Sequence, residues 1–361
     1  MPYAKWADMK LMKKLTDNKK STLRIILQSL PIVLAAIVFV IYVATFLPFS
    51  TRQMENSVAL VECESYYQIC AGGKPVLWFK NLGDSCMPEN MSIKAGQEVV
   101  TTKYSTCCWV NKYPLFPYCP GLLLTANKDS IAEKSIAAAN KDMASIIERT
   151  VRKLSAEIKQ LNRKIEEADY YMKVHNVNDD GYNIMADYAK AIRQQKEAAE
   201  ALCAKLKSIA KSKRVEMRLV TKYTLLCNDE TTDSIERTPC RIITTKKTSP
   251  LRLLQTANKA KSENATAIYM HQWLTPSPAA GDSIYAAAIP GCAQYGFTPE
   301  GKKPKVFASC AKNGSEHDLP QLLAPDGAAV FSRNGQFAGI SVNGKIIRPT
   351  SVGFGLKKLM P

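Results

Sequence analysis

The sequence predicts an α+β protein that combines a single N-terminal transmembrane helix, a long antiparallel coiled-coil hairpin and disulfide-rich β structure. Three observations predict this class. Residues 25–51 carry no charged side chain. Residues 128–215 contain no proline and repeat apolar side chains at alternating spacings of four and three. All 11 cysteines follow residue 51, most of them among short apolar runs bounded by turn residues.

The uncharged run at residues 25–51 predicts a retained membrane anchor. A helix that crosses a bilayer needs about 20 apolar residues, and this run is longer. Residues 1–24 contain seven basic and two acidic side chains, so the positive-inside rule predicts a cytoplasmic basic stub. The membrane is therefore one predicted partner. We expect localisation to the inner (plasma) membrane, with the N-terminus cytoplasmic and the bulk of the chain periplasmic or otherwise extracytoplasmic.

The composition is strongly basic, with a net charge of +17 over 361 residues. Nucleic acid is a frequent partner of such chains. However, no stretch alternates aromatic residues with arginines along one face. We therefore interpret the charge as solvated surface and expect no nucleic-acid partner.

The cysteines predict an oxidising compartment, because none precedes the apolar run. Residues 57–125 hold six of them and read as a Cys-rich β region of short strands. The first pairs to test are Cys227–Cys240 and Cys292–Cys310. The count is odd, and Cys203 is the candidate for the unpaired thiol because it lies in a helical segment with no other cysteine.

Residues 126–216 predict a helical hairpin. Two apolar seams run along residues 147–172 and 185–209, and the turn-forming segment 175–183 separates them. Leu154, Leu161 and Ile192 are examples of seam residues that we expect to be buried. The alternative is one long helix in a parallel dimer, so a homo-oligomer is possible. Three tyrosines near the turn are candidates for docking a protein partner or for filling the seam: Tyr170, Tyr171 and Tyr182.

Residues 217–361 are predicted to form a C-terminal β domain, with hairpin turns at Asn334-Gly335 and Asn343-Gly344. The segments FASCAKNG (307–314), APDGAAVFSRNGQFAGIS (324–341) and VGFGL (352–356) resemble the second barrel of trypsin-like serine proteases. The resemblance implies a trypsin-like β-barrel fold, interrupted here by the helical hairpin.

The same resemblance places Asp326 where the family has its nucleophilic serine, while Gly327 is kept and Ala328 replaces a glycine. A Ser–His–Asp enzyme also needs a base, and residues 57–125 contain no histidine. The histidines are His175, His271 and His317. The resemblance therefore implies a catalytically dead protease. We predict no catalytic, cofactor-binding or metal-binding residue.

A second resemblance is to periplasmic adaptor (membrane fusion) proteins. SIKAGQEVV (92–100) and LLAPDGAAV (322–330) resemble the two halves of their lipoyl-like domain, although about 110 residues separate the hairpin from the second half. Together these features predict a non-enzymatic scaffold or docking component of an envelope-spanning assembly, of the secretion or conjugation type. The alternatives are a transport adaptor and an inactive membrane-tethered protease.

Overall fold

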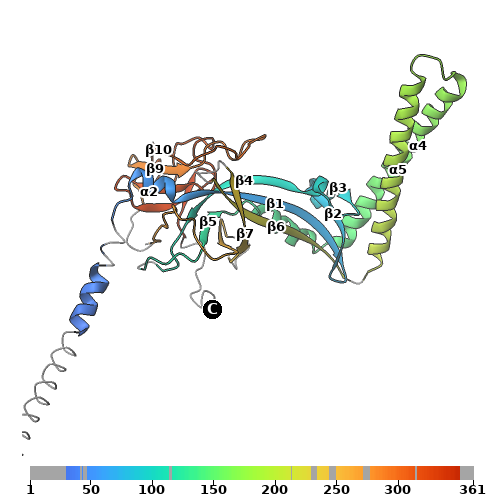
Figure 1. Ribbon diagram of the computed structural model, residues 1–361. Coiled ribbons are helices and arrows are strands. Elements are labelled where there is room, and N and C mark those ends of the chain that lie inside the picture. The colour runs from blue at the N-terminus through green and yellow to red at the C-terminus, as the bar shows by residue number, and fades with distance from the viewer. Residues whose placement is uncertain are drawn as a thin grey trace, which may run out of the picture.

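The computed structural model describes residues 30–40, 43, 47–113, 116–212, 214–228, 234–243, 249–270, 277–313 and 315–349. Figure 1 shows an elongated molecule. A β-barrel and a C-terminal sheet lie at one end, and two long helices project at the other. Long strands run between the two ends. Residues 1–24 and the segment 352–356 lie outside the described part of the chain.

Six antiparallel strands close into a barrel. Around the ring they run β1 (Val58–Ala71), β4 (Thr101–Trp109), β5 (Leu122–Ala126), β8 (Leu251–Thr256), β7 (Ile235–Ile242) and β6 (Val215–Asn228), and β6 pairs back onto β1. Closure leaves no edge strand exposed. Alternate side chains fill the lumen, among them Val61, Trp109 and Leu225. The barrel therefore draws its strands from both sides of the helical insertion.

The strands β1 and β6 have 14 residues each and continue beyond the barrel as a paired ribbon. At the far end β2 (Lys74–Leu82) and β3 (Pro88–Ser92) join this ribbon, together with the short 3-10 helices η1 (Asp84–Cys86) and η2 (Gln97–Val99). The result is a narrow sheet, and its apolar face must be buried against another element of the structure.

Three helices inserted between β5 and β6 supply this cover: α3 (Ser130–Ala139), α4 (Met143–Val174) and α5 (Tyr182–Ala210). Ile146 of α4 and Leu206 of α5 pack with Ile69, Phe79 and Met217 of the sheet in one buried cluster. The base of the helix pair is therefore part of a mixed helix–sheet core.

This core corrects the prediction of a long coiled coil. The helices α4 and α5 run antiparallel from Gly181, whose φ of +93° suits a glycine. Their lower halves pack on strands and not only on each other. Beyond Leu161, α4 buries only Ala168, and the first half of α5 buries only Ala189 and Ile192. The pair is thus not a self-contained coiled coil with a continuous seam of large side chains.

A buried ionic cluster fastens the start of the insertion to the barrel. Asp129 accepts hydrogen bonds from Thr221 Oγ1 (3.0 Å) and Tyr223 Oη (3.1 Å) of β6. Arg252 on β8 lies 3.7 Å from Asp129 Oδ2 and 3.3 Å from Glu133 Oε1, with its side chain only 5% exposed. Such a cluster fixes geometry because each buried charge requires its partners.

The C-terminal part forms a second antiparallel sheet, in the order β10 (Lys305–Cys310), β9 (Ser283–Ala288), β11 (Ala329–Ser332), β12 (Phe337–Val342) and β13 (Lys345–Ile347). One face packs on the outside of the barrel, where Phe331 and Ile340 meet Leu124 and Leu253. The short helix α2 (Thr51–Asn56), capped by Ser50 and Gln53, leads into β1 and adds Met54 to this core.

The predicted membrane anchor is wrong. Of residues 25–51 the structure describes a helix over 30–40, together with residues 43 and 47–51. Within the described residues, no helix has both the length and the apolar character required to cross a membrane. The single-pass topology and the inner-membrane localisation derived from residues 25–51 are corrected with it.

Candidate functional site

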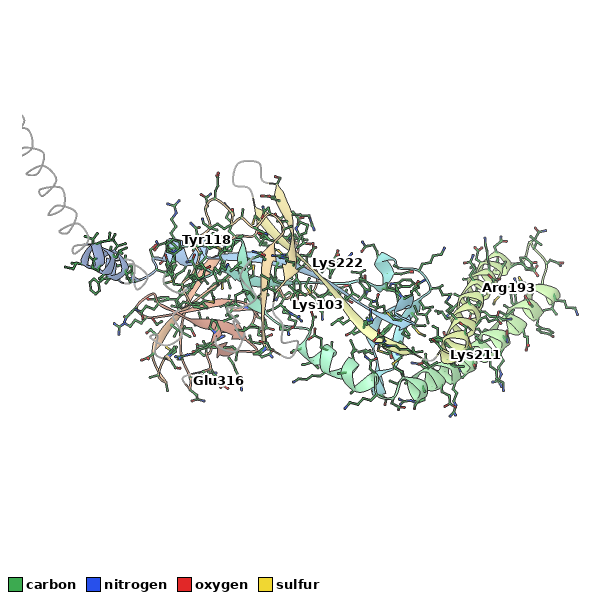
Figure 2. The ribbon with its side chains drawn as sticks, turned by 90° about the horizontal axis from the view of Figure 1, so that it is seen from below. Lys103, Tyr118, Arg193, Lys211, Lys222 and Glu316 are labelled. Atoms are coloured by element: carbon green, nitrogen blue, oxygen red, sulfur yellow. The ribbon has the colours of Figure 1, made fainter. Side chains whose placement is uncertain are left out.

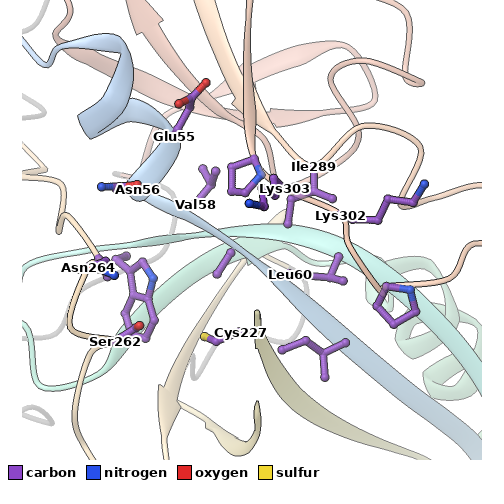
Figure 3. Close-up of a pocket in the computed structure, with 16 residues that line it drawn as sticks. Glu55, Asn56, Val58, Leu60, Cys227, Ser262, Asn264, Ile289, Lys302 and Lys303 are labelled. Carbon is purple, nitrogen blue, oxygen red and sulfur yellow. The ribbon is translucent and has the colours of Figure 1, made fainter. Parts of the chain in front are cut away.

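A groove lies where the barrel, helix α2 and the C-terminal part meet (Figure 3). Its volume is about 220 Å³. Ligand pockets for whole small molecules span about 300–1,000 Å³, so this groove suits one or two side chains of a bound segment.

The floor of the groove is apolar. Val58 and Leu60 come from β1, Leu226 from β6 and Ile289 from the end of β9, with Trp109 at one side. These side chains belong to barrel strands or to residues packed on them, so the floor is held rigidly. Rigid apolar surface is what a partner's apolar side chain can bury against without an ordering cost.

The rim of the groove is charged. Lys302 and Lys303 project from the loop between β9 and β10, and Glu55 lies across from them on α2 (Figure 3). Ser262 and Asn264 add polar groups on the side of Trp109. The arrangement favours an acidic segment that carries an apolar side chain. The groove could not be identified from the sequence, because its lining comes from six separate stretches of the chain.

Asp326, at the position of the family's nucleophile, lies on the turn before β11 and does not line the groove. Its Oδ1 accepts a hydrogen bond from the amide of Asn343 at 2.7 Å. The next residue, Gly327, has a φ of +94°, and its Cα approaches the carbonyl of Thr106 on β4 so closely that a Cβ would overlap it. This turn therefore makes a structural contact with the barrel.

Among the described residues, no hydrogen bond joins a histidine to Asp326. His317 is buried, and its Nε2 lies 2.8 Å from Ser341 Oγ. This resembles a base–nucleophile pair in distance, but Ser341 has no exposed surface and cannot reach a substrate. The neighbouring carboxylate of Asp318 is bonded to Ser309 and to the amide of Cys310. His175 lies on the hairpin loop, and His271 lies outside the described residues.

All 11 cysteines are free thiols in the structure, so neither predicted disulfide is formed. Cys240 pairs in register with Tyr223, four residues from Cys227 on the same strand. That offset of about 13 Å exceeds the reach of a disulfide, about 7 Å between Cα atoms. Cys292 is buried beside Thr106, whereas Cys310 is exposed on β10. Cys203 is buried on α5, near Ser155.

The thiol nearest the groove is not a nucleophile at neutral pH. Cys227 lines the groove, and burial raises the pKa of its thiol to about 11. Burial also raises the pKa of Cys240 to about 11 and that of Cys63 to about 12. Thiolate is the reactive form, so these thiols stay protonated and act as apolar filling of the barrel lumen.

The predicted docking residues lie near the tip of the hairpin but are not equivalent. Tyr170 is 69% exposed. Tyr171 is half-buried and packs against His175, with ring centres 4.1 Å apart and ring planes tilted by 35°, and it donates a hydrogen bond to the carbonyl of Asp180. Tyr182 is also half-buried, at the start of α5. The sequence analysis missed Val177 (63% exposed) and Ile184 (77% exposed) beside them.

No protein-family model matches this chain. No curated protein matches it in sequence. Among solved structures, it is similar to the MamO protease domain from Magnetospirillum magneticum, with 15% identity, a TM-score of 0.27, and coverage of 39% of this chain and 76% of that one. It is also similar to Deg5, with 9% identity, a TM-score of 0.32, and coverage of 83% and 87%.

Both neighbours belong to the trypsin-like protease class that the C-terminal segments resemble. The resemblance to adaptor proteins has no support.

Proposed function

We propose that this protein is a non-catalytic member of the trypsin-like protease class that holds an acidic peptide segment in the groove described above. The groove itself carries the proposal, because it joins a rigid apolar floor to a lysine rim. Support also comes from the carboxylate of Asp326 at the nucleophile position and from the buried, substrate-inaccessible His317–Ser341 pair. Binding of a peptide without cleavage requires only the groove, with its apolar floor and its lysine rim.

The proposal predicts a charge preference at the groove. Lys303 is exposed on the rim, so Lys303→Glu should leave folding intact and weaken the binding of acidic peptides roughly five- to tenfold. The measurement is fluorescence anisotropy of labelled acidic and basic peptides carrying one central aliphatic residue. Lys94→Glu, at an exposed lysine that does not line the groove, is the matched control.

The two variants distinguish an effect of the charge at the groove from an effect of the net charge of the protein. If Lys94→Glu weakens acidic peptides as much as Lys303→Glu does, the net charge of the chain and not the groove selects them. If wild-type protein binds basic and acidic peptides alike, the proposed groove specificity is wrong.

A second candidate function, the scaffold role expected from the sequence, is favoured by the exposed side chains at the hairpin tip. The hairpin projects away from the barrel (Figure 1) and places Tyr170 and Ile184 where a protein partner can reach them. On this proposal the barrel end and the tip are two docking sites held apart by a rigid arm. Membership of a secretion-type or conjugation-type assembly would be a particular case of it.

A further inference from the structure

The tip of the hairpin carries an unusual concentration of exposed apolar side chains. Single exposed apolar residues are normal on protein surfaces. Here the large ones gather on the last turns of α4, the loop and the first turns of α5: Tyr170 (69%), Val174 (55%), Val177 (63%), Ile184 (77%) and Tyr188 (46% exposed). Grouped exposure of this kind marks an interaction surface.

The same tip is acidic on a basic protein. Residues 170–188, which span this surface, contain Asp179, Asp180 and Asp187 and one basic residue, Lys173, whereas the chain has a net charge of +17. Farther down the arm Asp169 is already paired with Arg193, which Figure 2 shows on α5. The formal net charge of the tip surface is therefore negative.

The loop that presents these groups is held in shape. Asp179 Oδ2 accepts the amide of Asn176 at 2.8 Å and lies 3.4 Å from His175 Nδ1. Tyr171 bonds to the carbonyl of Asp180 across the loop. A loop fixed in this way loses little entropy when it docks.

The groove at the other end of the molecule has the complementary chemistry. Its floor is apolar, and the adjoining loop at residues 299–305 contains three lysines and one glutamate. An apolar side chain such as Val177, followed by two aspartates, matches an apolar floor beside Lys302 and Lys303. Tip and groove lie at opposite ends of the elongated molecule (Figure 1), so the tip of one chain cannot reach the groove of the same chain.

We propose that the hairpin tip of one copy docks into the groove of a second copy. This inference rests on the proposed function, because it names the groove's ligand as a segment of the chain itself. The contact joins two different surfaces, so it is a heterologous interface. When successive copies make the same contact, they form either closed rings or open chains of molecules. Apolar burial would supply affinity, and the charges would supply orientation.

The test is charge reversal at each surface of the full chain, followed by sedimentation velocity. One variant carries Asp179→Lys and Asp180→Lys, and the other carries Lys302→Glu and Lys303→Glu. Each alone should raise the dissociation constant for self-association at least about tenfold. An equimolar mixture of the two should associate again, because the basic tip of one meets the acidic groove of the other. Wild-type association should weaken as salt rises to about 0.3 M.

A variant with Glu197→Lys and Glu200→Lys, exposed acids lower on α5, is the matched control and should associate like the wild type. Self-association that neither reversal changes would overturn the proposal, as would two variants that stay apart when mixed. The tip variant keeps its groove, so it should still bind acidic peptides. If it binds them but the mixture does not associate, the tip proposal alone fails; if wild-type protein binds no acidic peptide either, the groove proposal fails as well.

Discussion

Gly327 shows how single residues join the two β units. Its φ of +94° lies in the left-handed region, and the carbonyl of Thr106 occupies the space that a side chain would need. A substitution there is strained and also forces the C-terminal sheet away from the barrel. The turn that the protease resemblance assigned to catalysis is thus a structural joint.

We predict that Gly327→Ala lowers the free energy of unfolding by about 2 kcal/mol or more, measured by urea denaturation. Gly344 is the matched control, because its φ is +75° and nothing lies within 4 Å of an added Cβ. Gly344→Ala should lower the free energy of unfolding by only about 1 kcal/mol, the cost of holding an alanine in the left-handed backbone conformation. Equal costs for the two variants would mean that Gly327 does not make the close contact with Thr106.

His317 gives the fold a dependence on pH. Burial lowers the pKa of its imidazole below the ordinary value, with Lys312 also lowering it and Asp318 opposing the shift. The unfolded chain therefore takes up this proton at a higher pH than the folded chain does. The contribution to stability is complete above about pH 6.5 and declines as the pH falls towards the folded pKa.

We predict that His317→Gln, which can still bond to Ser341, flattens the change in unfolding free energy between pH 7 and pH 5. The measurement is chemical denaturation at several pH values within that interval. A variant whose stability falls with pH as steeply as that of the wild type would show that other groups control the acid sensitivity.

At the scale of elements, the ionic cluster of Asp129, Glu133 and Arg252 fixes the orientation of the first inserted helix, α3, relative to the barrel. Arg252 holds Asp129 and Glu133, and both acids lie at or before the first turn of α3. Removal of the arginine would leave the buried carboxylate of Asp129 and the half-buried carboxylate of Glu133 without their charge partner.

Arg252→Met is therefore expected to cost about 3–5 kcal/mol in unfolding free energy, measured by denaturation. Lys345→Met breaks an exposed pair with Glu316, 3.5 Å apart, and should cost less than about 1 kcal/mol. Neutralising the acids as well, with Asp129→Asn and Glu133→Gln, should restore part of the lost stability. An Arg252→Met variant as stable as the wild type would mean that the cluster does not fasten the insertion.

The sequence predicts the existence and the ends of some of these elements but not of others. The change in periodicity after residue 128 and the glycine at 181 show locally where helices begin and end. The 14-residue strands β1 and β6 are not visible as such, because one end of each faces the barrel lumen and the other faces α4 and α5. The uncharged run at residues 25–51 meets the length rule for a membrane span, but no helix among the described residues is both long and apolar enough to cross a membrane.

At the scale of the molecule, sequence reasoning could place Asp326 on a turn but could not find the groove. Its lining joins residues near 58, 109, 226, 264, 289 and 303, which only the closed barrel and the packed sheet bring together. The hairpin then separates this groove from an acidic apolar tip. A protein built in this way can link two partners, or copies of itself, across the length of the arm.

We propose above that the groove binds an acidic peptide and leaves it intact. The most direct measurement is mass spectrometry of an acidic peptide library after incubation with the wild-type protein and capture of the complex. We expect recovery of bound peptides at their full mass, with fewer recovered by Lys303→Glu. Cleaved peptides that accumulate in proportion to the protein would contradict it.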